Sequence, residues 1–146
     1  MDAPLFEPIT VNQALDLIRQ YQQPPTDNLI CFGGMIDGKL KMVAAFAPFQ
    51  NIWELISLCK SDTQVQLSSL VAYCCKAMRK KNVLVTFCHK RGTLFQGSSW
   101  NYHGKDKQFL GKQLTQEHHI YWKSLNHHGN RIAKELKLEN NPYPKA

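Results

Sequence analysis

The chain has 146 residues, of which 43% are apolar and 20% are charged, and its formal net charge is +7. This composition is typical of an ordered globular protein and excludes a disordered chain, and the length favours one domain over residues 1–146. The longest apolar runs are too short to span a bilayer, and the N-terminal MDAPLFEP lacks the basic and apolar regions of a signal peptide. We therefore expect a cytoplasmic protein without membrane contact.

The positive charge is concentrated in one part of the sequence. Seven Lys and Arg residues and no Asp or Glu lie between Thr63 and Lys105, whereas the rest of the chain carries equal numbers of both signs. A basic face suggests a polyanionic partner, either a nucleic acid or a phosphate-bearing cofactor. The alternative is a solvated helix end.

The N-terminal third predicts a helix followed by a hairpin. Apolar residues at helical spacing predict a helix over residues 11–21. Two apolar runs within residues 28–49 flank a turn at Asp37-Gly38, which is typical of a β-hairpin. Residues 51–59 are short and mostly apolar and predict a further strand.

The middle of the chain predicts a helix between two strands. Thr63 and Gln66 match a capping box, which places a helix start after Thr63. The apolar stripe of this helix consists of Leu67, Leu70, Val71, Cys74, Ala77 and Met78. Asn82 can end it, and residues 83–89 read as a strand that is buried on both faces.

The last third predicts short elements and a proline-punctuated tail. Residues 93–99 suit one or two helical turns, residues 100–103 and 119–125 suit strands, and residues 130–138 suit a last helix. The whole order predicts an α/β (α+β) fold, a mixed sheet flanked by helices, with a right-handed crossover joining two parallel strands. In such sheets, ligands gather beyond the carboxyl ends of parallel strands.

Three groups of residues are candidates for chemistry. The turn into the central helix is a candidate anion site, to which Ser68 and Ser69 could add hydroxyl donors, although a plain capped helix explains it equally. His89 ends the buried strand at the expected ligand edge and could act as base or metal ligand; a surface histidine without a role is the alternative. Aromatic residues interleave with lysines near the C-terminus, as in proteins that stack an unpaired base, although half of them must face the core.

Metal and thiol chemistry have weaker signals. The pairs His118-His119 and His127-His128 are adjacent in sequence, so in a strand they point to opposite faces, and no zinc-binding spacing is present. Five cysteines without a CxxC pair read as free thiols in a reducing compartment.

This order of parts resembles the GNAT-type N-acyltransferases. Their strand-to-helix turn carries an Arg/Gln-x-x-Gly-x-Gly/Ala pattern that holds the coenzyme A pyrophosphate, and the nearest match is Gln64 to Ser69. Leu67 and Ser69 replace the two glycines. The resemblance implies an acetyl-CoA or related donor, with contacts from Gln64, Gln66, Ser68 and Ser69.

The stretch from Gly92 to Gly104 resembles, more narrowly, a segment of the Mom DNA-modification family of bacteriophages. That resemblance implies conversion of adenine N6 in double-stranded DNA to a carbamoylmethyl derivative, with a small-molecule donor and a divalent metal such as iron as a candidate cofactor. The protein would then work in the cytoplasm of the host cell. His89 stands where that family tends to carry an acidic residue, and Gln20-Tyr21 stands where it carries a histidine–tyrosine step.

Three functions follow as hypotheses. The first is a phage-type enzyme that modifies adenine N6 to evade restriction, with His89 and Tyr21 as its catalytic groups. Its DNA contacts would come from Lys80, Lys90, Arg91, Trp100, Tyr102, Lys105, Lys107 and Trp122. The second is an acyl-CoA-dependent N-acyltransferase that acts on a protein or small amine. The third is a non-enzymatic anti-restriction or host-takeover protein. The oligomeric state is left open.

Overall fold

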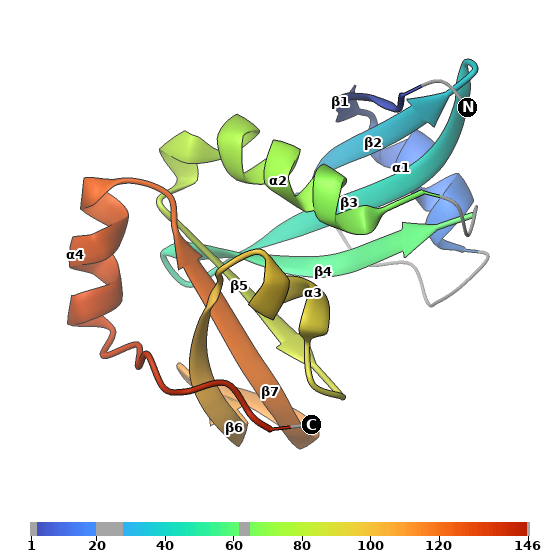
Figure 1. Ribbon diagram of the computed structural model, residues 1–146. Coiled ribbons are helices and arrows are strands. Elements are labelled where there is room, and N and C mark those ends of the chain that lie inside the picture. Colours follow the sequence, from blue (N-terminus) through green and yellow to red (C-terminus); the bar gives the residue numbers. More distant parts are fainter. Residues whose placement is uncertain (1–2, 20–27, 62–64, 146) are drawn as a thin grey trace. The chain divides into compact units, whose positions relative to one another are not determined.

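The computed structural model describes residues 3–19, 28–61 and 65–145 (Figure 1). The chain divides into two compact units. Unit 1 consists of Met1–Phe49 and Glu54–Ala77, and unit 2 of Gln50–Trp53 and Met78–Ala146.

Unit 1 contains four neighbouring strands in the order β1-β2-β3-β4. They are β1 (Leu5–Ile9), β2 (Ile30–Ile36), β3 (Lys39–Phe49) and β4 (Ile52–Lys60), whose first two residues belong to unit 2. β1 pairs antiparallel with β2, and β2 pairs antiparallel with β3 across the turn at Asp37-Gly38. Both turn residues have positive φ, which suits the aspartate and glycine found there.

Two helices cover opposite faces of β2 and β3 in unit 1 (Figure 1). Helix α1 (Val11–Ile18) packs its buried side, which includes Ile18, against Cys31. Helix α2 (Leu67–Ala77) places Tyr73 against Phe32, with ring centroids 5.8 Å apart. Successive strand residues point to opposite faces, so these neighbouring β2 residues serve different helices.

Unit 2 contains three antiparallel strands in the order β5-β7-β6. They are β5 (Val83–Cys88), β6 (Asn101–Phe109) and β7 (Lys112–Ser124). A 3-10 turn (Arg79–Lys81) precedes β5, helix α3 (Thr93–Gly97) follows it, and helix α4 (His127–Glu135) packs against β5 and β7. Trp100 and Tyr121 are among the largest side chains of the buried core.

Most predicted elements are present, but several positions differ from the prediction. Strand β1 was not predicted, because Pro8 interrupts its short apolar pattern. The predicted capping box does not start α2: Val65 and Gln66 are not helical, the helix begins at Leu67, and Thr63 lies outside the described residues. Ala77 of the predicted apolar stripe is exposed.

The C-terminal hairpin is longer than predicted. β6 and β7 extend through the polar stretch 104–118. Many residues of this stretch are exposed, so the sequence there does not alternate between apolar and polar residues. The strands join at Leu110 and Gly111, both with positive φ. Helix α4 begins at His127 rather than at residue 130, because the side chain of Asn126 accepts a hydrogen bond from Gly129 N and caps it. The N-terminal helix ends at Ile18, and residues 20 and 21 lie outside the described residues.

Candidate functional site

The start of α2 forms a basic, donor-rich turn in unit 1. Gln66 and Ser69 are exposed and Ser68 is half-buried, while Gln64 lies outside the described residues. The first turn of α2 has no acidic residue. The Nζ atom of Lys60 donates a hydrogen bond to the carbonyl oxygen of Val65, 3.1 Å away, just before the helix. A helix N-terminus with hydroxyls and an ammonium group nearby suits a phosphate group.

Lys60 was not among the residues predicted from the sequence. It is the last residue of β4, so the signal was a basic residue at the carboxyl end of a strand that leads into a helix. Leu67 stands where the GNAT pattern has its first glycine. It is the first helical residue and is half-buried.

His89 lies just beyond the end of β5 in unit 2 and is exposed. Its ring stacks on that of His118, with centroids 4.8 Å apart and planes 7° apart. Its Nε2 atom contacts the side-chain amide of Gln116. The catalytic role predicted for His89 stays a prediction, and its predicted companion Tyr21 lies outside the described residues.

A tyrosine and a histidine on neighbouring strands form the best-defined polar pair of unit 2. The hydroxyl of Tyr102 on β6 lies 2.7 Å from Nδ1 of His119 on β7. Burial, Lys105 and His118 lower the pKa of His119 below its usual 6.5, burial being the largest cause. Burial raises the pKa of Tyr102. At neutral pH the pair is therefore a neutral imidazole and a protonated phenol, and such an imidazole can accept a proton.

His119 was missed by sequence reasoning, which treated His118-His119 only as a metal candidate. The sequence did contain a signal for it. Neighbouring residues of a strand point to opposite faces, so His118 and His119 were expected to have different surroundings. His118 accordingly has different partners: its Nδ1 bonds to the backbone carbonyl of Gln116.

A second tyrosine, Tyr121, is completely buried beside this pair. Its hydroxyl donates to Oε1 of Gln96, 2.6 Å away, and accepts from the backbone N–H of Gly92, 3.1 Å away. Its ring lies 5.1 Å from that of Tyr102. Burial, partly offset by the Gly92 hydrogen bond, raises the pKa of Tyr121. Tyr121 therefore ties α3 to β7 and supports the ring of Tyr102.

The three aromatic rings that were predicted to contact DNA and stack against a base are buried in the structure. Trp100, Tyr102 and Trp122 are only 1%, 7% and 8% exposed. Each packs inside unit 2, and the indole N–H of Trp122 is held by the carbonyl of Glu139. A ring so buried has no open face on which a base could stack.

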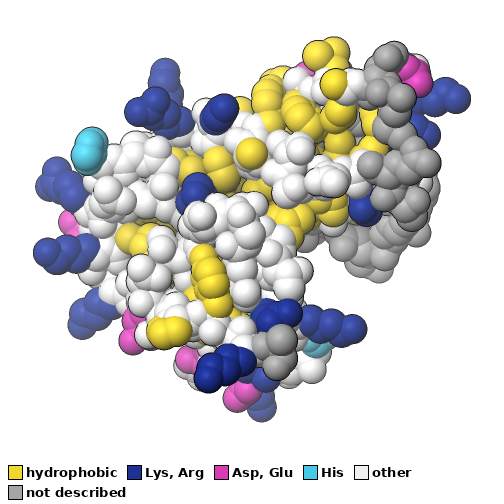
Figure 2. Space-filling view, viewed as in Figure 1, with side chains coloured by type: hydrophobic (Ala, Val, Ile, Leu, Met, Phe, Trp, Pro, Cys, Tyr) yellow, Lys and Arg dark blue, Asp and Glu magenta, His cyan; other side chains and the backbone are white. Residues whose placement is uncertain are grey.

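The predicted basic residues of unit 2 come from several of its segments. Lys80 precedes β5, Lys90 and Arg91 follow it, and Lys105 and Lys107 lie on β6. Lys105 also lies 3.8 Å from the carboxylate of Glu117. Figure 2 shows Lys and Arg side chains on the surface that it draws. Their contact with DNA phosphates stays a prediction.

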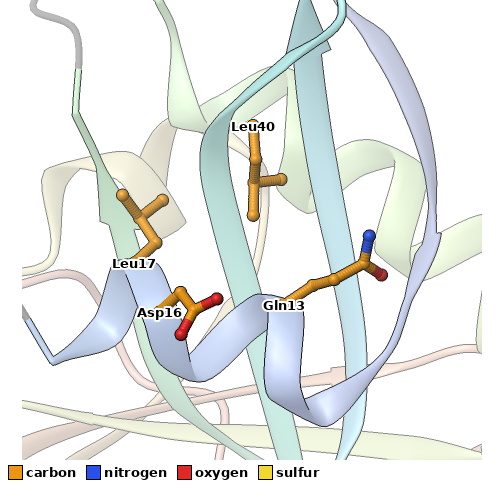
Figure 3. Close-up of a pocket in the computed structure, with 4 residues that line it drawn as sticks. All are labelled: Gln13, Asp16, Leu17 and Leu40. Atoms are coloured by element: carbon orange, nitrogen blue, oxygen red, sulfur yellow. The ribbon is translucent and has the colours of Figure 1, made fainter.

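Unit 1 also has an open hollow of about 260 Å³ between α1 and β3, lined by Gln13, Asp16, Leu17 and Leu40. Figure 3 shows the four side chains directed toward this shared space. The Gln13 amide oxygen is engaged in the capping box with Thr10. The lining therefore combines two polar and two apolar side chains and does not single out a ligand.

Among the described residues, no group of three or more His, Cys, Asp or Glu side chains could hold a metal ion. In the same part of the chain, no helix is long and apolar enough to cross a membrane. The five cysteines are free thiols, and burial raises the pKa of Cys88 to about 11, so this thiol is protonated at neutral pH.

Comparison with known proteins identifies the fold. No family model and no curated protein matches the sequence. Solved structures do match. An N-acetyltransferase from Staphylococcus aureus Mu50 has a TM-score of 0.63 at 14% identity, covering 85% of this chain and 99% of that chain. An IAA acetyltransferase from Bacillus cereus ATCC 14579 has a TM-score of 0.67 at 9% identity, covering 84% and 99%. The fold is that of the GNAT N-acetyltransferases.

A third matching structure, also of a GNAT protein, contains acetyl-CoA. A GNAT family acetyltransferase from Elizabethkingia anophelis with acetyl-CoA bound has a TM-score of 0.61 at 13% identity, covering 85% of this chain and 99% of that chain. The GNAT fold confirms the predicted α+β class of a mixed sheet flanked by helices. None of these three structures is described as a DNA-modifying protein, so the narrower resemblance to the Mom family stays a prediction.

Proposed function

We propose that the chain is an acyl-CoA-dependent N-acyltransferase whose acceptor is a protein or a small amine. The observation that carries this proposal is the hydrogen bond between Tyr102 and His119, found within a GNAT fold. This reading was the alternative at the level of sequence, and it is better supported than adenine modification. The fold neighbours are acetyltransferases, and the rings meant to stack a base are buried.

The start of α2 fits the phosphates of coenzyme A. Lys60 would supply a positive charge, Ser68 and Ser69 would supply hydroxyl donors, and the first amides of the helix would supply N–H groups. The first helical turn of α2, from Leu67 onward, has no carboxylate that would repel the donor. When bound, the donor supplies a thioester whose carbonyl carbon is open to attack by an amine.

His119 would prepare the acceptor amine. An alkyl amine has a pKa of roughly 10.4 and is therefore protonated and non-nucleophilic at neutral pH. The lowered pKa of His119 keeps its ring neutral. With the proton on Nδ1, this nitrogen donates to the Tyr102 oxygen, and the Nε2 lone pair can take a proton from the ammonium group. The hydrogen bond to Tyr102 persists in the imidazolium that results.

The balance of the reaction is then simple. The amine nitrogen forms a bond to the thioester carbonyl carbon, the carbon–sulfur bond breaks, and the electron pair leaves with sulfur. The ammonium group first gives one proton to His119, and the nitrogen loses a second proton to the medium when the amide forms. A thiol has a pKa of roughly 8.5, so the departing thiolate takes up a proton from the medium at neutral pH.

Purified protein incubated with acetyl-CoA and a panel of amines tests the proposal. Thiol release that depends on the amine, with acetylated product by mass spectrometry, is the expected result. His119→Gln should abolish most of this activity, and His118→Gln is the matched control because the neighbouring His118 makes no hydrogen bond to Tyr102. The absence of transfer to any amine would contradict the proposal.

Duplex DNA belongs in the same panel, because DNA as a partner stays a prediction. Modified adenine detected by nucleoside mass spectrometry, without amine acetylation, would restore the first hypothesis. Binding of DNA to a basic face should also weaken from low to physiological salt.

A further inference from the structure

The C-terminal residues Glu139 to Tyr143, named here the strap, run back along β6 (Figure 1). The backbone N–H of Asn141 donates to the carbonyl of Tyr102 at 2.8 Å, and its side-chain amide donates to the carbonyl of His103 at 2.8 Å. Asn141 therefore holds two successive residues of one strand.

A bulge in β6 makes this double contact possible. In a regular strand, successive carbonyls point to opposite sides, so one partner could not bind both. The pairing of β6 with β7 shifts register between Tyr102 and Gly104. Because of this irregularity, the carbonyls of Tyr102 and His103 do not point to opposite sides, and both accept hydrogen bonds from Asn141.

Further contacts fasten both ends of the strap. At its start, Glu139 donates its N–H to Nδ1 of His103 at 3.0 Å and accepts from the indole N–H of Trp122 at 2.7 Å. At its end, the hydroxyl of Tyr143 donates to the carbonyl of Trp100. The strap thus contacts Trp100, which precedes Tyr102 in the sequence, and His103, which follows it.

Tyr102 is consequently held from two directions: its carbonyl bonds to the strap and its hydroxyl bonds to His119. We infer that the strap positions the Tyr102–His119 pair, with Asn141 as a positioning residue for proton transfer at His119. This inference rests on the proposed acyl transfer for its kinetic part. Its structural part, the geometry of the pair, can be measured without any activity.

Asn141→Ala, which removes the side-chain bond to His103 and keeps the backbone bond to Tyr102, and a chain ending at Leu138, which removes both, test the inference. Asn140→Ala is the matched control. Asn140 is exposed beside Asn141 and makes none of the strap contacts given above. Titration of the His119 ring by NMR is the first readout. Because the strap holds the backbone of Tyr102, its loss should loosen the hydrogen bond to His119 and shift the midpoint of the His119 titration. Asn140→Ala should titrate like the native chain.

Kinetics supply the second readout. Asn141→Ala should lower kcat about tenfold with an unchanged KM for acyl-CoA, because misplacing a proton acceptor slows the chemical step without weakening donor binding. Adding the peptide ENNPYPKA to the shortened chain should restore part of the rate.

The outcomes separate the two proposals. If the native protein transfers no acyl group, the proposed function fails, but a shifted His119 titration in Asn141→Ala still supports the strap's role. If Asn141→Ala lowers only the melting temperature and leaves both the titration of His119 and kcat unchanged, the strap is merely structural and the inference is overturned. Should the shortened chain fail to fold, Asn141→Ala alone decides.

Discussion

The hydroxyl of Tyr102 and the Nδ1 atom of His119 lie 2.7 Å apart, on neighbouring strands β6 and β7. The bond fixes the orientation of the imidazole ring, and in the tautomer with the proton on Nδ1 it leaves Nε2 as proton acceptor. Without it, the ring is free to rotate and to exchange tautomers, as in other sites where a partner of one nitrogen defines the role of the other.

Tyr102→Phe removes only this hydrogen bond and keeps the buried ring. We expect kcat to fall by about 10- to 100-fold, since a positioned acid–base group contributes on the order of 10²–10⁴ and the imidazole itself remains. Steady-state acetyl transfer measures the effect. Tyr73→Phe, which removes the hydroxyl of a tyrosine that packs against Phe32 in unit 1, is the control, and equal losses in the two variants would count against the pair.

The acid limb of the pH–rate profile should report His119. Its pKa is lowered, so the ring is neutral at pH 7 and becomes protonated only below its usual 6.5. We therefore expect kcat to be constant near neutral pH and to fall as the pH decreases and His119 becomes protonated, with a midpoint below 6.5. Measuring kcat at saturating substrates between pH 5 and pH 8 checks this. A midpoint above 6.5 that His119→Gln leaves in place would assign the limb to another group.

Lys60→Ala should weaken donor binding. The Lys60 ammonium lies at the turn into α2 through its hydrogen bond to Val65. Losing its charge near the donor phosphates should raise KM for acyl-CoA about tenfold, with little change in kcat. Lys39→Ala, which removes an exposed lysine at the start of β3, should leave KM unchanged. Unaltered binding of coenzyme A to Lys60→Ala by calorimetry would show that the phosphates lie elsewhere.

Gly92→Ala should destabilise the fold of unit 2. An added Cβ at Gly92 would lie 2.7 Å from Cε2 of the buried Tyr121 and 3.1 Å from Phe95. Overpacking of this kind costs about 1–3 kcal/mol of unfolding free energy. Urea denaturation measures the loss.

Gly97→Ala provides the control for that substitution. A Cβ at Gly97 meets nothing within 4 Å, and the residue ends helix α3. Replacing a helical glycine by alanine stabilises by about 0.5–1 kcal/mol. Similar destabilisation in both variants would mean that backbone freedom, and not contact with Tyr121, explains the need for glycine at position 92.

Hydrophobic periodicity by itself determined much of this protein. It located α1, the β2–β3 hairpin, the body of α2 and the buried strand β5, because their apolar spacing reflects burial within the element. It also predicted the α+β class that the GNAT structures confirm. The elements it missed have weak apolar patterns: β1 carries Pro8, and most of the β6–β7 arm is exposed.

Only the tertiary structure decided which polar groups meet. Tyr102 and His119 are 17 residues apart, and their contact depends on the register of β6 against β7 and on the bulge at His103. The strap's hold on β6 joins residues nearly 40 positions apart, such as Asn141 and His103. Composition likewise predicted aromatic rings at a DNA surface, whereas packing placed Trp100 and Trp122 inside the core. Periodicity records whether a residue is buried, but the partner it meets there depends on strand pairing, which no local pattern contains.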